Sequence, residues 1–502
     1  MMELLSDDLL LNVMQYLDVP DLFACRLVCK RLGALALDRD AWRHRKLATT
    51  FHDGLFPWVA ELQGRAPAPA MPCVCPVLRL APCLRVLELD LPPQRCRLAY
   101  TSTRCAVEEL RLSICMGPHP DASSGIASSY QAAAVLSRQE SLGRLRRLHF
   151  DLNPGTDAPA FVATMASTPG LEELEVLEIC APDRSNPALG CTILASSLRR
   201  FKYTLSDTIS KHFANFILSG HAATLEVVDL GKSPHEVTFK STASLLAGVL
   251  NLRELTCCTM PGLEVLADCE TLRVLNLVVG TKRQHKSAGA SAAKLLRGAK
   301  HLREVELQYK PLASKDSNVG VDLVMALAQG KSCGRVEKLS IVNTLDEDED
   351  DYDFDLDGVE KPLPQLKALI CALPSLSGMR HLRIVADMNP EKLLSAISPA
   401  TAPSLEIVEL PLPRLACAHA FIHGSEVKTV LAANPLLHIK LCNPICYCKQ
   451  KECQPCKTPK CHKQLRDVEY GSTLVLFSHD PSDKCSRAHS PTKYNLWIHI
   501  PL

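Results

Sequence analysis

One six-residue pattern, apolar-x-x-apolar-x-apolar, recurs thirteen times in this chain of 502 residues. The copies begin at Leu84, Val107, Leu145, Leu171, Leu198, Leu225, Leu252, Leu272, Leu302, Val336, Met379, Leu405 and Leu436. Their starts lie 26 or 27 residues apart from Leu145 to Leu252 and about 29 residues apart on average, which leaves room for one strand and one helix per unit. Such a unit cannot bury its apolar face alone. The repeat therefore predicts stacked units that share a continuous core.

The fifth position of the pattern, which plays no part in defining it, is polar in all thirteen copies. It holds Glu88, Arg111, His149, Glu175, Lys202, Asp229, Thr256, Asn276, Glu306, Ser340, Arg383, Glu409 and Lys440. This alternation is typical of a strand with one buried face. Between the copies, the segments 210–220, 242–251, 291–300 and 321–330 space their apolar residues three and four apart, which predicts helices.

With these features the region 84–441 resembles a leucine-rich-repeat solenoid of the longer, helix-containing kind, with about thirteen units. The resemblance implies an α/β fold with a parallel sheet on the concave side and helices outside. The alternative is an ordinary α/β domain with repeated amphipathic units. The exposed strand positions of such an arch usually bind proteins. The candidates for substrate binding near its centre are Lys202, Asp229, Thr256, Asn276 and Glu306.

The first forty-five residues have a different, leucine-rich helical pattern. Ser6 or Asp7 can cap a first helix, and Pro20 is acceptable in the first turn of a second. A third helical stretch follows, and these short helices carry more apolar residues than they can cover by themselves. An exposed apolar surface of this kind predicts a partner.

This segment, residues 3–45, resembles an F-box. The opening of the family pattern, Leu-Pro-x-Glu-Leu-Leu-x-x-Ile-x-x-x-Leu, corresponds to Leu5, Ser6, Asp8, Leu9, Leu10, Val13 and Leu17. Its middle and end correspond to Asp21, Leu22, Val28, Cys29, Lys30 and Arg31 and then to Ala41, Trp42 and Arg43. Ser6 replaces the family proline and Leu32 the usual aromatic residue, departures that weaken the expected affinity for the adaptor. A helical cap on the N-terminal end of the solenoid is the alternative.

The resemblance implies that the F-box docks on a Skp-family adaptor, and through it on cullin and RING subunits. The repeats would then hold an unknown protein substrate for ubiquitination. The residues expected at the adaptor interface are Leu5, Leu9, Leu10, Val13, Leu17, Leu22, Leu27, Val28, Cys29 and Trp42. The chain itself would be a non-catalytic subunit of the ligase. The alternative is a non-catalytic repeat scaffold unconnected to ubiquitin.

Composition and motifs exclude several other classes. No Walker loop, His-Glu-x-x-His or Gly-x-Ser-x-Gly motif is present, so an enzyme is the weaker hypothesis. A net charge of +1 argues against nucleic acid or an anionic membrane as partner. An acidic N-terminus, no apolar stretch long enough to span a bilayer and no Asn-x-Ser/Thr glycosylation sequon favour a cytosolic or nuclear protein that is not secreted. In such a compartment most of the 23 cysteines are expected to be thiols.

Two segments flank the repeats. Residues 46–83, proline-rich from 64, are expected to form an extended connector. The tail 442–502 is rich in cysteine and contains two candidate strands, 472–478 and 494–500. Cys453-x-x-Cys456 has the spacing of a zinc-binding pair, which Cys461 or His462 could complete as a structural site. Free thiols or disulfides explain these cysteines equally well, and no other cofactor is expected.

Overall fold

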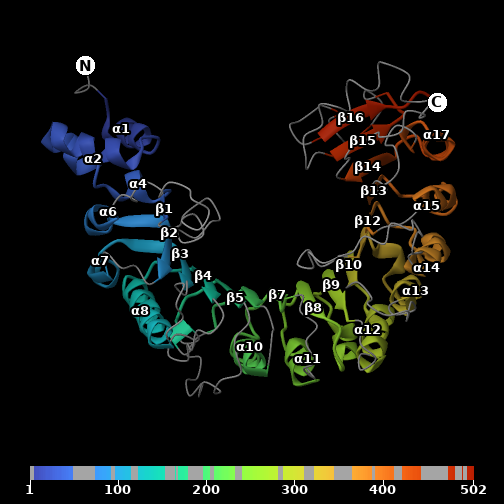
Figure 1. Cartoon of the computed structure of the whole chain (residues 1–502), viewed down its shortest axis with the longest axis horizontal. Coiled ribbons are helices and arrows are strands. Elements are labelled where there is room, and N and C mark those ends of the chain that lie inside the picture. Colours follow the sequence, from blue (N-terminus) through green and yellow to red (C-terminus); the bar gives the residue numbers. More distant parts are fainter. Residues whose placement is uncertain are drawn as a thin grey trace. The chain divides into compact units, whose positions relative to one another are not determined.

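The computed structural model of the chain forms two compact units, residues 1–237 with 248–251 and residues 238–247 with 252–502. The described residues are 5–48, 74–91, 97–114, 122–152, 164–165, 168–178, 196–203, 208–231, 240–280, 286–309, 321–343, 364–386, 390–411, 421–442, 473–480, 485, 489 and 495–502. Figure 1 shows the same organisation in both units: strands form one layer and helices cover one face of it. The other face of each sheet, free of helices in the described part of the chain, is called the open face below.

The first unit begins with four short helices, α1 (Asp7–Met14), α2 (Val19–Val28), α3 (Lys30–Leu35) and α4 (Arg39–Trp42). Ser6 caps α1 by accepting the Leu9 amide, and Asp18 caps α2, which has a proline in its first turn. Both starts agree with the sequence prediction. The sequence predicted three helices, however, and α4 is a fourth. Asp38 caps it by accepting the Asp40 amide.

The rest of the first unit alternates strands and helices. Its strands are β1 (Lys46–Ala48), β2 (Cys83–Leu91), β3 (Ala106–Ile114), β4 (Arg147–Leu152), β5 (Glu173–Glu178), β6 (Arg200–Tyr203) and β7 (Val227–Asp229). Each pairs in parallel with the next. The helices are α6 (Cys75–Leu80), α7 (Arg97–Ser102), α8 (Ala122–Ser141) and α10 (Thr208–Gly220). β1 and α6 thus lie where the sequence predicted only an extended connector.

The second unit repeats this plan and ends in a different pairing. Its strands are β8 (Glu254–Cys258), β9 (Val274–Val279), β10 (Glu304–Tyr309), β11 (Lys338–Asn343), β12 (His381–Val385), β13 (Ile407–Pro411), β14 (His438–Cys442), β15 (Thr473–Phe477) and β16 (Asn495–His499). All neighbours from β8 to β14 are parallel, β15 is antiparallel to β14, and β16 is parallel to β15. The two candidate strands of the tail are therefore confirmed as β15 and β16.

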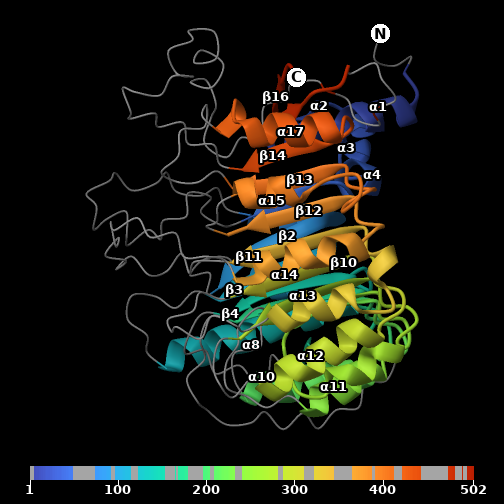
Figure 2. The same cartoon turned by 90° about the vertical axis from the view of Figure 1, so that its right-hand side faces the viewer.

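The helices of the second unit cover a single face of its sheet. They are α11 (Lys240–Ala247), η2 (Leu263–Asp268), α12 (Lys286–Gly298), α13 (Val321–Ala328), η4 (Cys333–Arg335), α14 (Pro364–Ala372), η5 (Leu373–Ser375), α15 (Pro390–Ala396) and α17 (Ser425–Ala433). Figure 2 shows α12, α13, α14, α15 and α17 following one another along the sheet. These arrangements confirm a mixed α/β fold: N-terminal helices precede the parallel strands of the first unit, and a largely parallel sheet alternates with helices in the second, as expected of a repeat solenoid.

Each of the thirteen copies of the sequence pattern contains strand residues, from β2 to β14, and most copies begin two residues before their strand. Their apolar positions are buried with one exception, Leu436, which is exposed; the next residue, Leu437, is buried in its place. Within each unit, the fifth positions of neighbouring copies are directly in register, as in Glu175 with Lys202 and Glu306 with Ser340. Arg111 and Lys202 are exposed, Ser340 is buried, and the other fifth positions are half-buried.

Candidate adaptor and substrate surfaces

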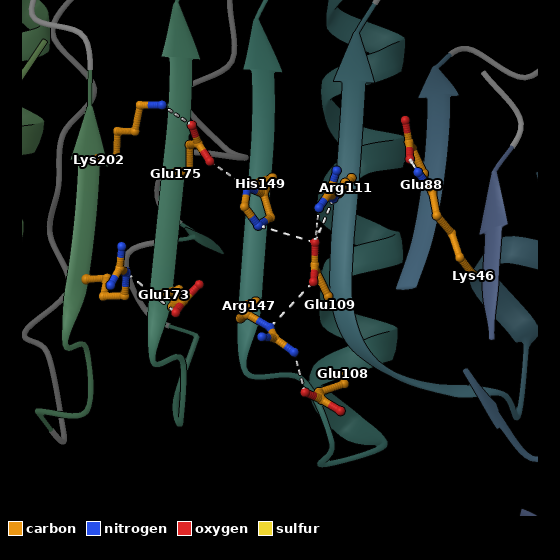
Figure 3. Close-up of polar contacts among 11 residues, drawn as sticks. Lys46, Glu88, Glu108, Glu109, Arg111, Arg147, His149, Glu173, Glu175 and Lys202 are labelled. Carbon is orange, nitrogen blue, oxygen red and sulfur yellow. Dashed lines mark hydrogen bonds and ion pairs between the residues drawn. The ribbon is translucent and has the colours of Figure 1, made fainter. Parts of the chain in front are cut away.

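The open face of the first unit carries a row of polar side chains that crosses β2 to β7 in register. Figure 3 shows this row from Glu88 to Lys202. In the middle of this row, the carboxylate of Glu175 lies 2.7 Å from His149 Nδ1 and 2.5 Å from Lys202 Nζ. Burial raises the pKa of Glu175, but hydrogen bonds from Lys202 and His149 outweigh it and lower the pKa below its usual value. Glu175 therefore carries its charge at neutral pH and holds both neighbours.

A second row lies two residues earlier on the same strands. Its best-connected member is Glu109, which is buried and accepts from Arg111 at 2.6 Å. Glu109 also lies 3.5 Å from Arg147 Nε and 3.4 Å from His149 Nε2 (Figure 3). Positions three and five of the pattern share a face because side chains alternate along a strand. The sequence analysis treated the third position as unspecified and so missed this row.

The charges of the two rows largely compensate one another. Lys46 pairs with Glu88 at 2.5 Å, Arg200 lies 3.6 Å from Glu173, and Arg147 pairs with Glu108. Opposite signs placed this close give a field that changes sign from strand to strand. Such a face fits a protein surface of mixed charge better than a polyanion, which needs an extended basic surface.

The corresponding row in the second unit centres on Arg383 and Glu409, whose side chains lie 3.3 Å apart. A hydrogen bond from His381 is the main reason that the pKa of Glu409 falls to about 2, and the Cys442 thiol donates to the same carboxylate at 3.1 Å. Burial and the neighbouring Glu409 raise the pKa of Cys442 to about 12. Cys442 is therefore a neutral hydrogen-bond donor at physiological pH.

Asp90, near the end of β2, provides a test of these electrostatics. Burial, together with Glu88 and Asp151, raises its pKa to about 6. Because this value lies above the usual 3.8, the folded state holds the proton more tightly than the unfolded state, and stability falls as the pH rises from about 4 through 6.

Asp90→Asn should therefore raise the free energy of unfolding at pH 7.5, by an amount of the order of 1 kcal/mol once solvent screening is considered. Urea unfolding of the wild type and the variant at pH 7.5 and at pH 4 measures this effect. The gain in stability of the variant over the wild type should vanish at pH 4. A variant no more stable than the wild type at pH 7.5 would contradict the prediction.

The N-terminal helices expose apolar side chains in two places. On α1 and the turn after it, Leu9 (53% exposed), Val13 (56%) and Tyr16 (91%) follow a spacing of four and three and so lie along one stripe. At the end of α2, Leu27 (85%) and Val28 (68%) are exposed as well. Large apolar side chains left in water on adjoining helices mark an interaction surface.

Two arginines hold these helices in place. Arg31 donates to Asp7 Oδ1 at 2.6 Å and to the Leu5 carbonyl at 2.6 Å, so it ties α3 to the start of α1. Arg45 donates to the carbonyls of Met14, the last residue of α1, and of Leu17, in the turn after it, at 2.6 and 2.7 Å. The Arg45 carbonyl in turn accepts from the amide of Arg85, just inside β2, at 2.9 Å. The helices are thus fixed to the sheet of the first unit.

The family model for the F-box-like domain matches residues 7–48. This segment is an F-box-like domain. The match ends at the last residue of β1, so the domain includes the strand that joins it to β2. The match confirms the prediction of an F-box from the leucine pattern and the Val-Cys-Lys-Arg motif.

Comparison with solved structures places the chain beside the yeast complex of Rad7 and Elc1, with a TM-score of 0.35 and 13% identity over 72% of this chain and 88% of that one. A likeness at this level supports no statement about activity or partners. A search of curated protein sequences gave no match. No helix among the described residues has the length and hydropathy needed to cross a membrane.

The ten residues predicted for the adaptor interface of the F-box-like domain differ in their exposure to solvent. Six are exposed: Leu5, Leu9, Val13, Leu27, Val28 and Cys29. Leu17 is half-buried, and three lie in the interior: Leu10, Leu22 and Trp42. Trp42 Nε1 donates to the Ala36 carbonyl at 2.7 Å, which is the role of a core residue. Tyr16 was missed, although its place three residues after Val13 is a signal that could have found it.

The five residues predicted for substrate binding all lie on the open faces. Lys202 and Asp229 are in register in the first unit. Thr256, Asn276 and Glu306 are in register in the second, where the Asn276 amide donates to Thr256 Oγ1 at 3.1 Å. Their contact with a substrate stays a prediction.

The zinc ligands predicted in the tail, Cys453, Cys456, Cys461 and His462, lie outside the described residues. The structure instead brings together four other residues of the second unit that the sequence analysis did not single out: His438, His479, Cys485 and His489.

Proposed function

We propose that this chain is the substrate-recognition subunit of a Skp–cullin–F-box ubiquitin ligase. The observation that carries the proposal is the F-box-like domain, whose exposed apolar stripe on α1 has no cover in the described part of the chain. Burying an apolar side chain of the size of leucine contributes about 1.5–3 kcal/mol. A few such side chains are enough to anchor an adaptor, because most binding energy in an interface comes from a small number of residues.

In this proposal the F-box-like domain contacts the Skp-family adaptor through Leu9, Val13, Tyr16, Leu27 and Val28. The buried residues Leu10, Leu22 and Trp42 support that surface from inside. The adaptor connects the chain to cullin and RING subunits, which bring the charged ubiquitin carrier. The chain supplies no catalytic group and acts by holding a substrate lysine close to the carrier, so that transfer occurs at a high effective concentration.

The open faces of the two units are the proposed substrate surfaces. Their alternating charges favour a protein substrate with a complementary pattern of charges. Such charge complementarity contributes to the specificity of binding more than to its affinity. Lys202 and Asp229 in the first unit and Thr256, Asn276 and Glu306 in the second are the proposed contacts. Because exposed pairs contribute only about 0–1 kcal/mol each to stability, they can exchange their internal partners for those of a substrate at little cost.

The direct test is co-expression of the full chain with a Skp-family adaptor and a cullin–RING pair, followed by purification through the chain. We expect the chain and adaptor to co-elute in a one-to-one complex on size exclusion, and the assembly to retain the cullin. A folded chain that elutes alone and captures no adaptor would overturn the proposal and favour the scaffold that is unconnected to ubiquitin.

A further inference from the structure

Four side chains that can bind a metal meet at the C-terminal end of the second unit. His438 is the first residue of β14, His479 follows β15, and Cys485 and His489 lie in the segment before β16. One ligand atom from each lies within 4.8 Å of all the others. His438 Nε2 is 3.0 Å from His489 Nε2, and Cys485 Sγ is 3.7 and 3.6 Å from these two nitrogens.

Two of the histidines are oriented by backbone carbonyls. His479 Nδ1 lies 2.8 Å from the Pro435 carbonyl, and His438 Nδ1 lies 3.3 Å from that of Glu406. A carbonyl oxygen can only accept, so in each ring Nδ1 carries the hydrogen and Nε2 presents its lone pair. A hydrogen bond from the second ring nitrogen to a carbonyl is the arrangement that fixes histidine ligands around zinc.

The lone pair of His479 is not otherwise used. His479 is 6% exposed, and its Nε2 is buried with no hydrogen-bond partner among the described residues. A buried polar atom without a partner destabilises the folded chain. A cation in the centre of the cluster would bind this lone pair and remove this destabilisation.

The spacing and chemistry of the four ligands select the metal. Zinc bonds of about 2.0–2.1 Å to nitrogen and about 2.3 Å to sulfur in a tetrahedron place ligand atoms roughly 3.3–3.6 Å apart. The separations of Cys485 Sγ from the two histidine nitrogens, 3.7 and 3.6 Å, lie close to that range. The 3.0 Å between His438 Nε2 and His489 Nε2 is shorter, and all four ligand atoms lie within 4.8 Å of one another, so small side-chain movements bring them to tetrahedral spacing. Three imidazoles and one thiolate suit zinc, whereas calcium and magnesium require oxygen ligands.

Aromatic side chains pack against the cluster, in which His438 and His479 are buried and Cys485 and His489 are half-buried. The ring of Phe477 stacks on His489 at 4.6 Å between centroids, and Trp497 meets the same ring edge-on at 4.6 Å. Trp497 also contacts His438 at 5.7 Å. Rings packed around a ligand set restrict its movement and exclude water, as in metal sites that are built into a fold.

We propose that His438, His479, Cys485 and His489 bind one structural zinc ion that fixes the segment after β15 against β14. Four protein ligands leave no position for water or substrate, which is the feature of a structural site. On binding, Cys485 loses its thiol proton to solvent and the thiolate bonds to zinc, while the three histidines bind as neutral rings. The ion would clamp the end of the sheet, where β15 and β16 follow the last repeat strand.

Metal analysis of the full chain, purified without chelator, tests the proposal. We expect about one equivalent of zinc per chain, and a double variant Cys485→Ser/His489→Gln that retains less than a tenth of it. The matched control, Cys453→Ser/Cys456→Ser, changes the same number of residues in the tail and should keep the full equivalent. Less than about half an equivalent in the wild-type chain, or loss of zinc in the control but not in the double variant, would overturn the site.

Cobalt substitution distinguishes loss of the site from loss of folding. Chain stripped of metal and titrated with Co²⁺ should show the visible bands of a tetrahedral ion and a thiolate-to-cobalt charge-transfer band, both saturating at one equivalent. Cys485→Ser alone should lose the charge-transfer band while the far-UV circular dichroism and the urea-unfolding midpoint of the metal-free chain stay unchanged. A charge-transfer band that persists in Cys485→Ser would show that another cysteine is the ligand and would overturn the assignment.

Discussion

Replacing Leu9 and Val13 together by aspartate should abolish binding of the Skp-family adaptor, with a fall in affinity of more than about 100-fold. Both side chains are more than half exposed and lie on one stripe of α1, so the change places two charges in the proposed interface. A charge buried without a partner costs several kcal/mol, and this cost arises only when the complex forms. Isothermal titration with purified adaptor measures the loss directly.

The same variant should leave the free chain nearly as stable as the wild type, because exposed substitutions usually change stability by less than about 0.5 kcal/mol. Leu98→Asp is the matched control, since Leu98 is a highly exposed leucine on α7 in the same unit. It should bind the adaptor as the wild type does. Undiminished binding by Leu9→Asp/Val13→Asp would remove α1 from the interface and would falsify the proposed docking surface.

Trp42→Ala should destabilise the F-box-like domain by about 3–5 kcal/mol, the range measured for large aromatic residues in protein cores. Trp42 is fully buried, packs against Phe23 with 5.7 Å between ring centroids, and lies under the Arg45 guanidinium. Its removal leaves a cavity and also leaves the Ala36 carbonyl without its donor. Hydrogen exchange in α1 to α4, compared with exchange in the second unit, measures this local loss.

Trp42→Phe is the companion variant, because it keeps an aromatic ring but not the N–H donor. We expect a smaller loss of about 1–2 kcal/mol, composed of one hydrogen bond and a partial cavity. Adaptor binding should fall in Trp42→Ala only to the extent that the helices unfold. A Trp42→Ala domain that stays folded but no longer binds would place Trp42 in the interface, against its burial.

The repeat could be predicted from the sequence because its cause is local. A strand with one buried face alternates apolar and polar side chains whatever its neighbours are, so the pattern around Leu148 and His149 is visible without knowledge of the fold. The same holds for the caps at Ser6 and Asp18, where a side chain bonds the backbone three residues on. The F-box motif is similarly contained in one short segment.

Exposure within the F-box-like domain was decided by tertiary packing. Leu9 and Leu10 are neighbours of the same type in one helix, yet Leu9 is exposed and Leu10 is buried. Which of them faces inward depends on where α3 and α4 lie against α1, and Arg31 and Arg45 fix that placement through contacts 24 to 31 residues away. The family pattern, which carries no information on this packing, therefore placed both leucines, and Trp42, among the expected adaptor contacts.

The sequence by itself determined the strand repeat, the polar face of its strands and the N-terminal domain. Only the tertiary structure decided the partners on those faces and the position of the four-ligand cluster. Glu109 meets Arg147 because β3 and β4 pair in one particular register. His438 and His489 are separated by 51 residues and meet because β15 turns back against β14. Strand pairing is a non-local choice that depends on the whole chain, whereas alternation along a strand is set by the backbone of each segment.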